Sequence, residues 1–223
     1  DPLPKLAPLI ARVPGLGRPV RVPDRMLPLG DLPFLVEAHR RPPPPPLPLA
    51  PAPDRLARAA ARLAAAGPSP WLAVTWQAGL RRPGALLKEL PPAILGRVVA
   101  GWPGTVIVLQ RGARPADVAA FQACLGRPAA DFGDLHESLD DMLATLAVLD
   151  EYVAVSNTNV HLRAGAGRPS RVLVPWPPEF RWRAGLERSP WFPDHPLLRQ
   201  ASDGGWEDAL AVLARDLSRP VGA

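Results

Sequence analysis

Tyr152-Val153-Ala154-Val155-Ser156-Asn157-Thr158-Asn159-Val160-His161-Leu162 joins an apolar, β-branched run to four polar residues and a second apolar segment. The run from Tyr152 to Val155 predicts a buried strand, and the residues after Asn159 predict a helix that packs closely on its neighbours. Ser, Asn and Thr are residue types whose side chains cap helices. Residues 156–159 therefore predict a tight turn and a helix start.

The start of this helix is a candidate anion site. Its first amides have no partner within the helix, and together with the helix dipole they favour a phosphate group. His161 falls in the first turn, where its ring can face the same crevice, and Arg163 and Arg168 add positive charge. From the spacing alone, a simple helix cap is the alternative interpretation.

Length and composition indicate a globular protein. The 223 residues suffice for one large domain, or for one complete domain and part of another. No apolar run approaches the roughly 18 to 20 residues of a membrane span and no signal-peptide pattern is present, so we expect a cytoplasmic protein without an integral membrane segment. Cys124 is the only cysteine and the four histidines are scattered, so we expect no disulfide, metal or other cofactor.

The basic charge does not indicate a nucleic-acid partner. The net charge is +5 and the pI is near 10.5, but of the 26 basic residues only Lys5 and Lys88 are lysines. The arginines are spread in ones and twos, as in Arg40-Arg41, and no aromatic stacking platform accompanies them. We therefore expect no nucleic acid among the partners.

The first third of the chain is rich in proline. Residues 1–41 are predicted to form loops with one or two short elements, and the chain begins without a methionine, which indicates a fragment or an ordered part of a longer protein. Pro42 to Pro46 predict an extended surface connector, with a proline-rich docking ligand as the less favoured alternative. Asp54 is expected to cap a helix that ends at Ala66, before Gly67-Pro68.

From Pro70 onward, strand and helix patterns alternate. Further strands are expected at 71–76, 105–109 and 171–174, and further helices at 91–100, 115–125, 138–149 and 206–217. This alternation predicts an α/β fold with a mostly parallel sheet that is covered on both faces. Ligands of such sheets bind beyond the carboxyl ends of the strands, which here are residues 76–79, 110–112, 156–159 and 175–176.

Short segments at these strand ends carry a resemblance to a known family. They are Val74-Thr75-Trp76-Gln77-Ala78-Gly79, Val108-Leu109-Gln110-Arg111-Gly112, Val155 to Leu162, and Arg181-Trp182 with Ser189 to Pro193. Their order and spacing make residues 71–217 similar to the nucleotide-sugar-binding half of bacterial heptosyltransferase-like glycosyltransferases. These enzymes have the GT-B fold, and the branch often fused to tetratricopeptide repeats is the most similar.

The resemblance implies two facing Rossmann-like halves. Residues 1–67 would be a remnant of the amino-terminal, acceptor-side domain with the proline-rich connector, because Leu27 to Phe34 resembles the last part of that domain. Residues 68–223 would be the carboxyl-terminal nucleotide-sugar-binding domain.

The implied activity is metal-independent, inverting transfer of a hexose or heptose from a nucleotide sugar to an acceptor saccharide, lipid or protein. Asn157, Thr158, Asn159 and His161 would surround the donor diphosphate, and Lys88 matches a basic position near the phosphates. A solvated helix-start lysine is the alternative for Lys88. The other expected substrate-binding residues are Trp76, Gln77, Ser156, Trp182 and, near the nucleoside, Gln110 and Arg111.

The chain departs from the family in three ways. Ser156 stands where the heptosyltransferases proper have an aspartate, and Arg163 with the following Ala-Gly-Ala-Gly differs from the family's usual small-residue helix. The amino-terminal segment that supplies the catalytic carboxylate in the family is not found in this sequence. A non-catalytic interaction or scaffold protein with the same fold is therefore the alternative.

Two side-chain groups allow two interpretations each. Trp176, Trp182 and Trp191 lie close to Arg181 and Arg183; they can stack on a sugar or base, but we favour a role in fixing a loop to the domain. The acidic residues between 131 and 141 suggest a metal cluster, but their spacing favours a solvated, helix-capping face. They are Asp131, Asp134, Glu137, Asp140 and Asp141.

Overall fold

Six parallel strands form the central sheet. The computed structural model describes residues 5–14, 37, 40, 44–79 and 86–218. The sheet has the order β5-β4-β1-β6-β7-β8, and its strands are β1 (Leu72–Thr75), β4 (Val106–Val108), β5 (Ala130–Asp131), β6 (Glu151–Val155), β7 (Arg171–Val174) and β8 (Leu197–Arg199). The chain moves outward from β1 to one edge, returns to β6 and then moves to the other edge. This is the doubly wound order of Rossmann-like sheets.

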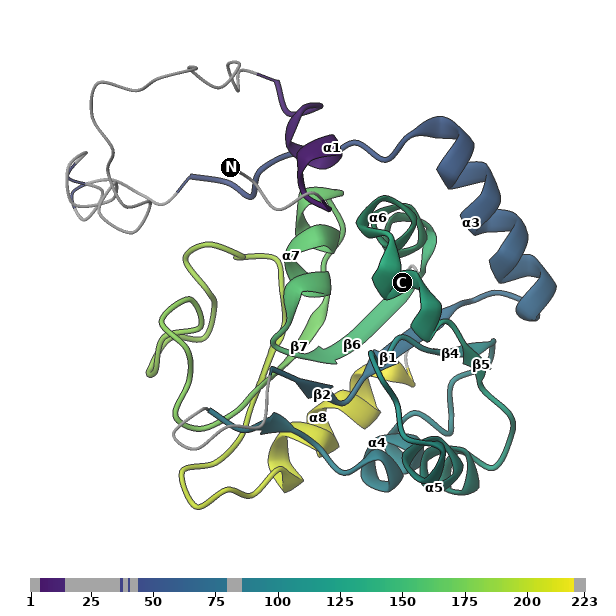
Figure 1. Ribbon diagram of the computed structural model, residues 1–223. Helices are drawn as coiled ribbons and strands as arrows, with labels where there is room; N and C mark the ends of the chain where they lie inside the picture. The colour runs from purple at the N-terminus through teal and green to yellow at the C-terminus, as the bar shows by residue number, and fades with distance from the viewer. Residues whose placement is uncertain (1–4, 15–36, 38–39, 41–43, 80–85, 219–223) are drawn as a thin grey trace.

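Helices cover both faces of the sheet (Figure 1). One face carries α4 (Pro92–Val98), α5 (Pro115–Leu125) and α8 (Glu207–Leu217); the other carries α1 (Ala7–Ile10), α3 (Pro53–Ala66), α6 (Leu139–Val148) and α7 (Thr158–Gly165). Side chains alternate between the faces along each strand. In β6, Val153 and Val155 pack toward the α4 side, whereas Tyr152 and Ala154 pack toward the α6 side. The sheet thus separates two hydrophobic cores.

The expected elements from residue 54 onward are confirmed, each within two residues of its expected bounds. The sequence missed β5, β8 and an antiparallel pair, β2 (Gln77–Ala78) with β3 (Lys88–Glu89). These strands have only two or three residues, too few for a hydrophobic period to be recognised. The expectation for Leu27 to Phe34 lies outside the described residues. Within the described part of the chain, no helix is both long enough and apolar enough to cross a membrane.

The proline-rich connector runs along the carboxyl end of α7. The Leu49 amide donates to the Gly165 carbonyl at 2.8 Å. A Cβ atom at position 165 would lie 2.7 Å from the Leu49 side chain, so this approach requires glycine. The connector leads into α3, which begins at Pro53 with Ala52 in the cap position. The expectation that Asp54 caps this helix is wrong, because its carboxylate pairs with Arg58 one turn later, at 2.9 Å.

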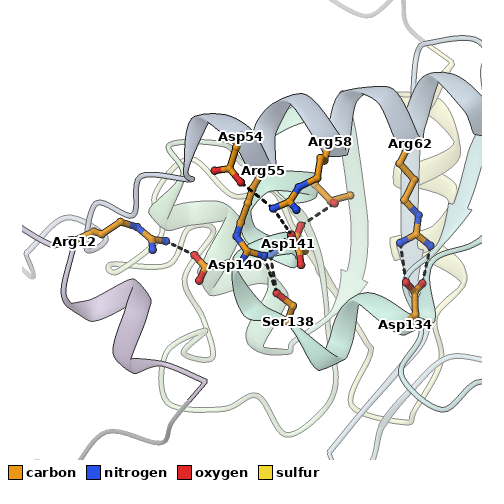
Figure 2. A network of polar contacts seen from close by, with 10 residues as sticks. Arg12, Asp54, Arg55, Arg58, Arg62, Asp134, Ser138, Asp140 and Asp141 are labelled. Atoms are coloured by element: carbon orange, nitrogen blue, oxygen red, sulfur yellow. Dashed lines mark hydrogen bonds and ion pairs between the residues drawn. The ribbon is translucent and has the colours of Figure 1, made fainter.

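Ion pairs fix α3 and the chain near α1 to the domain (Figure 2). Arg62 forms two hydrogen bonds with Asp134, at 2.7 and 2.8 Å. Arg55 bonds Asp141 at 2.6 Å, and Arg12 pairs with Asp140. Asp131, Asp134 and Glu137 are exposed and Asp140 and Asp141 lie in the first turn of α6, as expected for a solvated, helix-capping face. The sequence did not indicate that three of these carboxylates pair with arginines from preceding segments. Ser138 caps α6 as expected, accepting from the Asp141 amide at 3.2 Å.

Candidate functional site

The candidate site lies where the direction of winding reverses, between the carboxyl ends of β1 and β6. These two strands pair from Leu72 with Glu151 to Thr75 with Ala154, and their helices leave on opposite sides of the sheet. Doubly wound sheets bind their ligands at the carboxyl edge where the winding reverses. The residues that leave the two strands here are Trp76-Gln77 and Ser156-Asn157.

The turn after β6 forms the predicted helix cap. The Asn157 side-chain oxygen accepts from the Val160 amide at 3.1 Å, and the Asn157 side-chain NH₂ group donates to the Tyr152 hydroxyl at 3.2 Å. The amides of Thr158 and Asn159 open the helix and have no carbonyl partner inside it. The Thr158 residue is exposed, and Asn159 is buried. The turn therefore presents the start of α7 at the carboxyl edge of the sheet.

A buried hydroxyl pair holds this turn to the sheet. The Tyr152 hydroxyl lies 2.9 Å from the Thr75 hydroxyl, which donates to the Leu109 carbonyl at 3.0 Å. Burial raises the pKa of Tyr152, although hydrogen bonds with Thr75, Asn157 and Asn159 oppose this shift. Tyr152 is therefore a neutral hydrogen-bonding anchor between β1, β6 and the start of α7.

Three polar groups meet at the Glu179 carboxylate. The Lys88 ammonium lies 3.3 Å from one carboxylate oxygen, and the Arg181 guanidinium lies 3.0 Å from the same oxygen. The Ser156 hydroxyl donates to the other oxygen. Burial pushes the pKa of Glu179 upward, but the Ser156 hydroxyl, Lys88 and Arg181 together hold it below the ordinary value. Glu179 is thus an ionised carboxylate at neutral pH, in contact with two cations.

The β2–β3 pair brings Lys88 to this point. Lys88 pairs with Ala78 in the short antiparallel ladder, and the Leu90 amide donates to the Trp76 carbonyl at 2.9 Å. Lys88 is thereby held beside the end of β1. Lys88 is the first residue of the short strand β3, and its side chain is mostly buried, so the solvated helix-start interpretation does not describe it.

Aromatic rings form the wall next to α7. Trp182 is fully buried, and its indole N–H donates to the Ser156 hydroxyl at 2.8 Å. The His161 ring centre lies 6.3 Å from that of Trp182 and 5.0 Å from that of Phe192. Burial, with the nearby charge of Arg181, lowers the pKa of His161 to about 4. His161 is therefore a neutral imidazole at pH 7.

The tryptophans differ in their environments. Trp182 fixes its segment to the domain, as expected, whereas Trp176 and the neighbouring Phe180 are exposed on the same segment. Trp191 packs edge-on against Phe180, with ring centres 5.8 Å apart. The exposed rings lie close in sequence to Glu179 and Arg181, and Phe180 also contacts the Arg181 guanidinium, 4.7 Å from its ring centre.

Gln110 and Trp76 shape the turn after β1. The Gln110 side-chain oxygen accepts from the amides of Trp76 and Gln77, and its NH₂ group donates to the carbonyls of Gln77 and Arg111, at distances from 2.9 to 3.2 Å. Trp76 is buried and stacks on Phe121 in the core below the sheet. The structure therefore brings Ser156, Asn157, His161, Trp182 and Lys88 together, whereas Trp76 and Gln110 stabilise the backbone beside them. Gln77 is half-buried, and Arg111 is exposed.

The sequence did not identify Glu179 as part of the site. It follows Pro177-Pro178 after the end of β7, next to the central strand β6. A carboxylate just beyond a strand end is the available signal, but only the fold shows that Lys88 lies opposite it. Within the described residues, no group of three or more His, Cys, Asp or Glu side chains is placed to hold a metal ion.

Comparison with solved structures supports the fold. A glycosyl transferase family 9 protein from Veillonella parvula aligns with 78% of this chain and 54% of its own length, at 14% identity and a TM-score of 0.55. Escherichia coli heptosyltransferase WaaC, solved with ADP-2-deoxy-2-fluoro heptose, aligns with 63% of this chain and 41% of its own length, at 17% identity and a TM-score of 0.41. The first similarity shows a glycosyltransferase-like α/β fold and confirms the expected fold class.

Sequence comparison gives one curated relative. Protein FlbA of Caulobacter vibrioides is 30% identical over 175 residues, which are 76% of this chain and 28% of FlbA. No family model matches the chain. The chain thus spans little more than a quarter of that relative and about half of the Veillonella protein.

Proposed function

We propose that this chain is the donor-binding half of a glycosyltransferase, and that the start of α7 holds the diphosphate of a nucleotide sugar. The observation that carries the proposal is the meeting of Lys88 and the α7 turn at Glu179. Lys88 comes from a hairpin after β1, and Ser156 comes from the end of β6. Their convergence at the winding reversal of a doubly wound sheet, beside a helix start, is an arrangement that favours a phosphate group.

Each residue has a role in this scheme. The amides of Thr158 and Asn159 bind phosphate oxygens, with Asn157 holding the turn in place. Lys88, Arg181 and the helix dipole offset the negative charge that grows on the leaving diphosphate. Neutral His161 lines the same site without adding charge. The positive charge is supplied by the protein, so the scheme needs no metal ion, and transfer to the acceptor is inverting.

The remaining expectations belong to the same proposal. Residues 68–223 form the donor domain, and residues 1–67 hold the connector and the end of an acceptor-side domain that would supply the general base. The longer protein carries tetratricopeptide repeats and works in the cytoplasm. Half-buried Gln77 and exposed Arg111 would be further ligand contacts beside the turn after β1, whereas buried Trp76, Gln110 and Trp182 support this turn and Ser156.

A non-catalytic interaction protein is the second candidate. The observation in its favour is that Lys88 and Arg181 already have a carboxylate partner within the chain. A domain that had lost its ligand would retain such a pair for stability alone. The two functions differ in whether the site binds nucleotide.

Titration calorimetry with uridine, guanosine and adenosine diphosphates tests the proposal. We expect one of them to bind, and we expect His161→Ala and Asn157→Ala to abolish measurable binding. Asp203→Ala, on the β8–α8 loop, is the control and should bind as the wild type does. Failure of all three nucleotides to bind, or unchanged affinity in the two site variants, would remove the donor-site assignment.

A further inference from the structure

Glu179 has the position and contacts of a bound anion. Its carboxylate is held by an ammonium, a guanidinium and a hydroxyl group that come from three parts of the chain: Lys88 on β3, Arg181 in the segment after β7, and Ser156 at the end of β6. These are the donor types that bind a phosphate group. The groups that hold the Glu179 carboxylate could therefore hold another anion, such as a phosphate, in its place.

The charges at this point do not cancel. Two cations face one carboxylate, and the exposed fractions of the three side chains are 17% for Lys88, 20% for Glu179 and 26% for Arg181. Their interaction is consequently only partly screened by water. An excess positive charge remains, and a diphosphate carries more negative charge than a single carboxylate. The donors would therefore favour the diphosphate once Glu179 has moved away.

The segment that carries Glu179 is anchored to the domain by the residues that follow it, Arg181 and Trp182. Trp182 is fully buried, and its carbonyl accepts from the Arg199 guanidinium at 2.6 Å. The Arg181 carbonyl accepts from the Ser189 hydroxyl at 2.7 Å. Phe180, next to Glu179, is 69% exposed. Rotation of the Glu179 side chain toward solvent therefore does not require the anchored part of the segment to move.

We propose that Glu179 is a built-in competitor that fills the phosphate position of the ligand-free site and must leave before a diphosphate binds. This inference rests on the proposed function and adds a regulatory element to it. The site is closed by the chain's own carboxylate, and only a ligand with enough negative charge displaces it. A neutral sugar or a nucleoside without phosphates would leave Glu179 in place.

The test is calorimetric titration of the full chain with inorganic pyrophosphate. Glu179→Gln retains the shape of the side chain but removes its charge, and we expect it to bind pyrophosphate at least about tenfold more tightly than the wild type. Glu187→Gln is the matched control, because it removes one carboxylate from an exposed position on the same segment. It should bind within about twofold of the wild type. Adding Lys88→Met to Glu179→Gln should remove the gain.

Equal or weaker binding by Glu179→Gln would overturn the inference, as would the absence of pyrophosphate binding in every variant. If Glu179→Gln does not fold, Glu179→Ala serves as the second variant, with the same expected gain. Nucleoside diphosphates separate this result from the proposed function. If Glu179→Gln gains affinity for pyrophosphate but no nucleoside diphosphate binds better than pyrophosphate, the competitor role stands and the nucleotide-sugar assignment fails.

Discussion

Basic side chains lie near both ends of α7, but they have different partners at the two ends. At the carboxyl end, the Arg163 side chain is 1% exposed and donates to the carbonyls of Leu146, Leu149, Asp150 and Pro169. At the amino end, Lys88 and Arg181 pair with a single carboxylate. Backbone carbonyls cannot leave without unfolding, whereas a side-chain carboxylate can. Positive charge is therefore available to a ligand only at the amino end.

This comparison corrects one expectation from the sequence. Arg163 and Arg168 were expected to add positive charge to the anion site, but both donate to the Leu149 carbonyl, at 3.1 Å each. The carbonyls at the end of α6 lack partners within their own helix, and the arginines satisfy them. Burial lowers the pKa of Arg163 to about 10, which still leaves it charged at pH 7. It is a structural cation.

The largest expected effect comes from removing the hydrogen bonds of Arg163 at the carboxyl end of α7. Arg163→Met should lower the free energy of unfolding by about 3–5 kcal/mol, because it leaves several buried carbonyls without donors. Arg168→Met, which removes a single bond from an exposed residue, should cost about 1 kcal/mol or less. Urea unfolding measures both. A loss below about 1 kcal/mol for Arg163→Met would contradict the assigned role.

The next largest effect is a loss of stability in acid, caused by two buried histidines, one near each end of α7. Burial is the main cause that lowers the pKa of His161, near Arg181, and of His195, near Arg163, to about 4. Unfolding then takes up protons below pH 6.5, so stability is full above that pH and falls as the pH drops toward 4. Each histidine accounts for up to about 3 kcal/mol. The double variant His161→Asn, His195→Asn should show a flatter pH profile in urea unfolding, and an unchanged profile would argue against both shifts.

Loss of a cation at the amino end of α7 should affect ligand binding more than the free energy of unfolding. Lys88→Met should weaken nucleoside diphosphate binding by about 10- to 100-fold, because it removes a charge-assisted contact with the phosphates. The free energy of unfolding should change by only about 1 kcal/mol, because Arg181 and the Ser156 hydroxyl still hold the Glu179 carboxylate. Lys5→Met, which removes the exposed pair with Glu137, is the control. Equal affinities for the two variants would mean that Lys88 does not face the ligand.

The smallest effect is expected for the helix cap itself. Asn157→Ala removes the bond to the Val160 amide and should cost about 1 kcal/mol in unfolding free energy. Asn157→Ser retains a capping side chain and should cost less. Because the cap and the proposed ligand site share one turn, Asn157→Ala is also expected to abolish nucleotide binding. Persistent binding would mean that the cap is only structural and would count against the donor-site assignment.

The sequence predicted the layers of the fold better than the contacts of the site. Strand and helix periods and the capping types at Ser138 and Asn157 are local signals, and both caps form as expected. The partners of charged side chains are not local. Nothing near Glu179 in the sequence indicates that it contacts Lys88, and nothing near Arg62 indicates that it pairs with Asp134. Such contacts depend on strand order and helix packing, which single-sequence patterns do not encode.

Gln110 illustrates the same limit at a single residue. The family resemblance implied that Gln110, at a strand end, lies near the nucleoside, and the strand end is observed. However, its side chain is nearly fully buried, and both ends of its amide bond the backbone of the turn after β1. A polar residue at a strand end can bind a ligand or complete the turn beside it, and the difference depends on where neighbouring amides point.

A crystal structure of the chain soaked with a nucleoside diphosphate tests the central claim most directly. The account predicts phosphate oxygens within hydrogen-bond distance of the Thr158 and Asn159 amides and of the Lys88 ammonium, with the Glu179 carboxylate turned away. Nucleotide bound elsewhere on the domain, or a Glu179 carboxylate still joined to Lys88 and Ser156 beside a bound nucleotide, would contradict it.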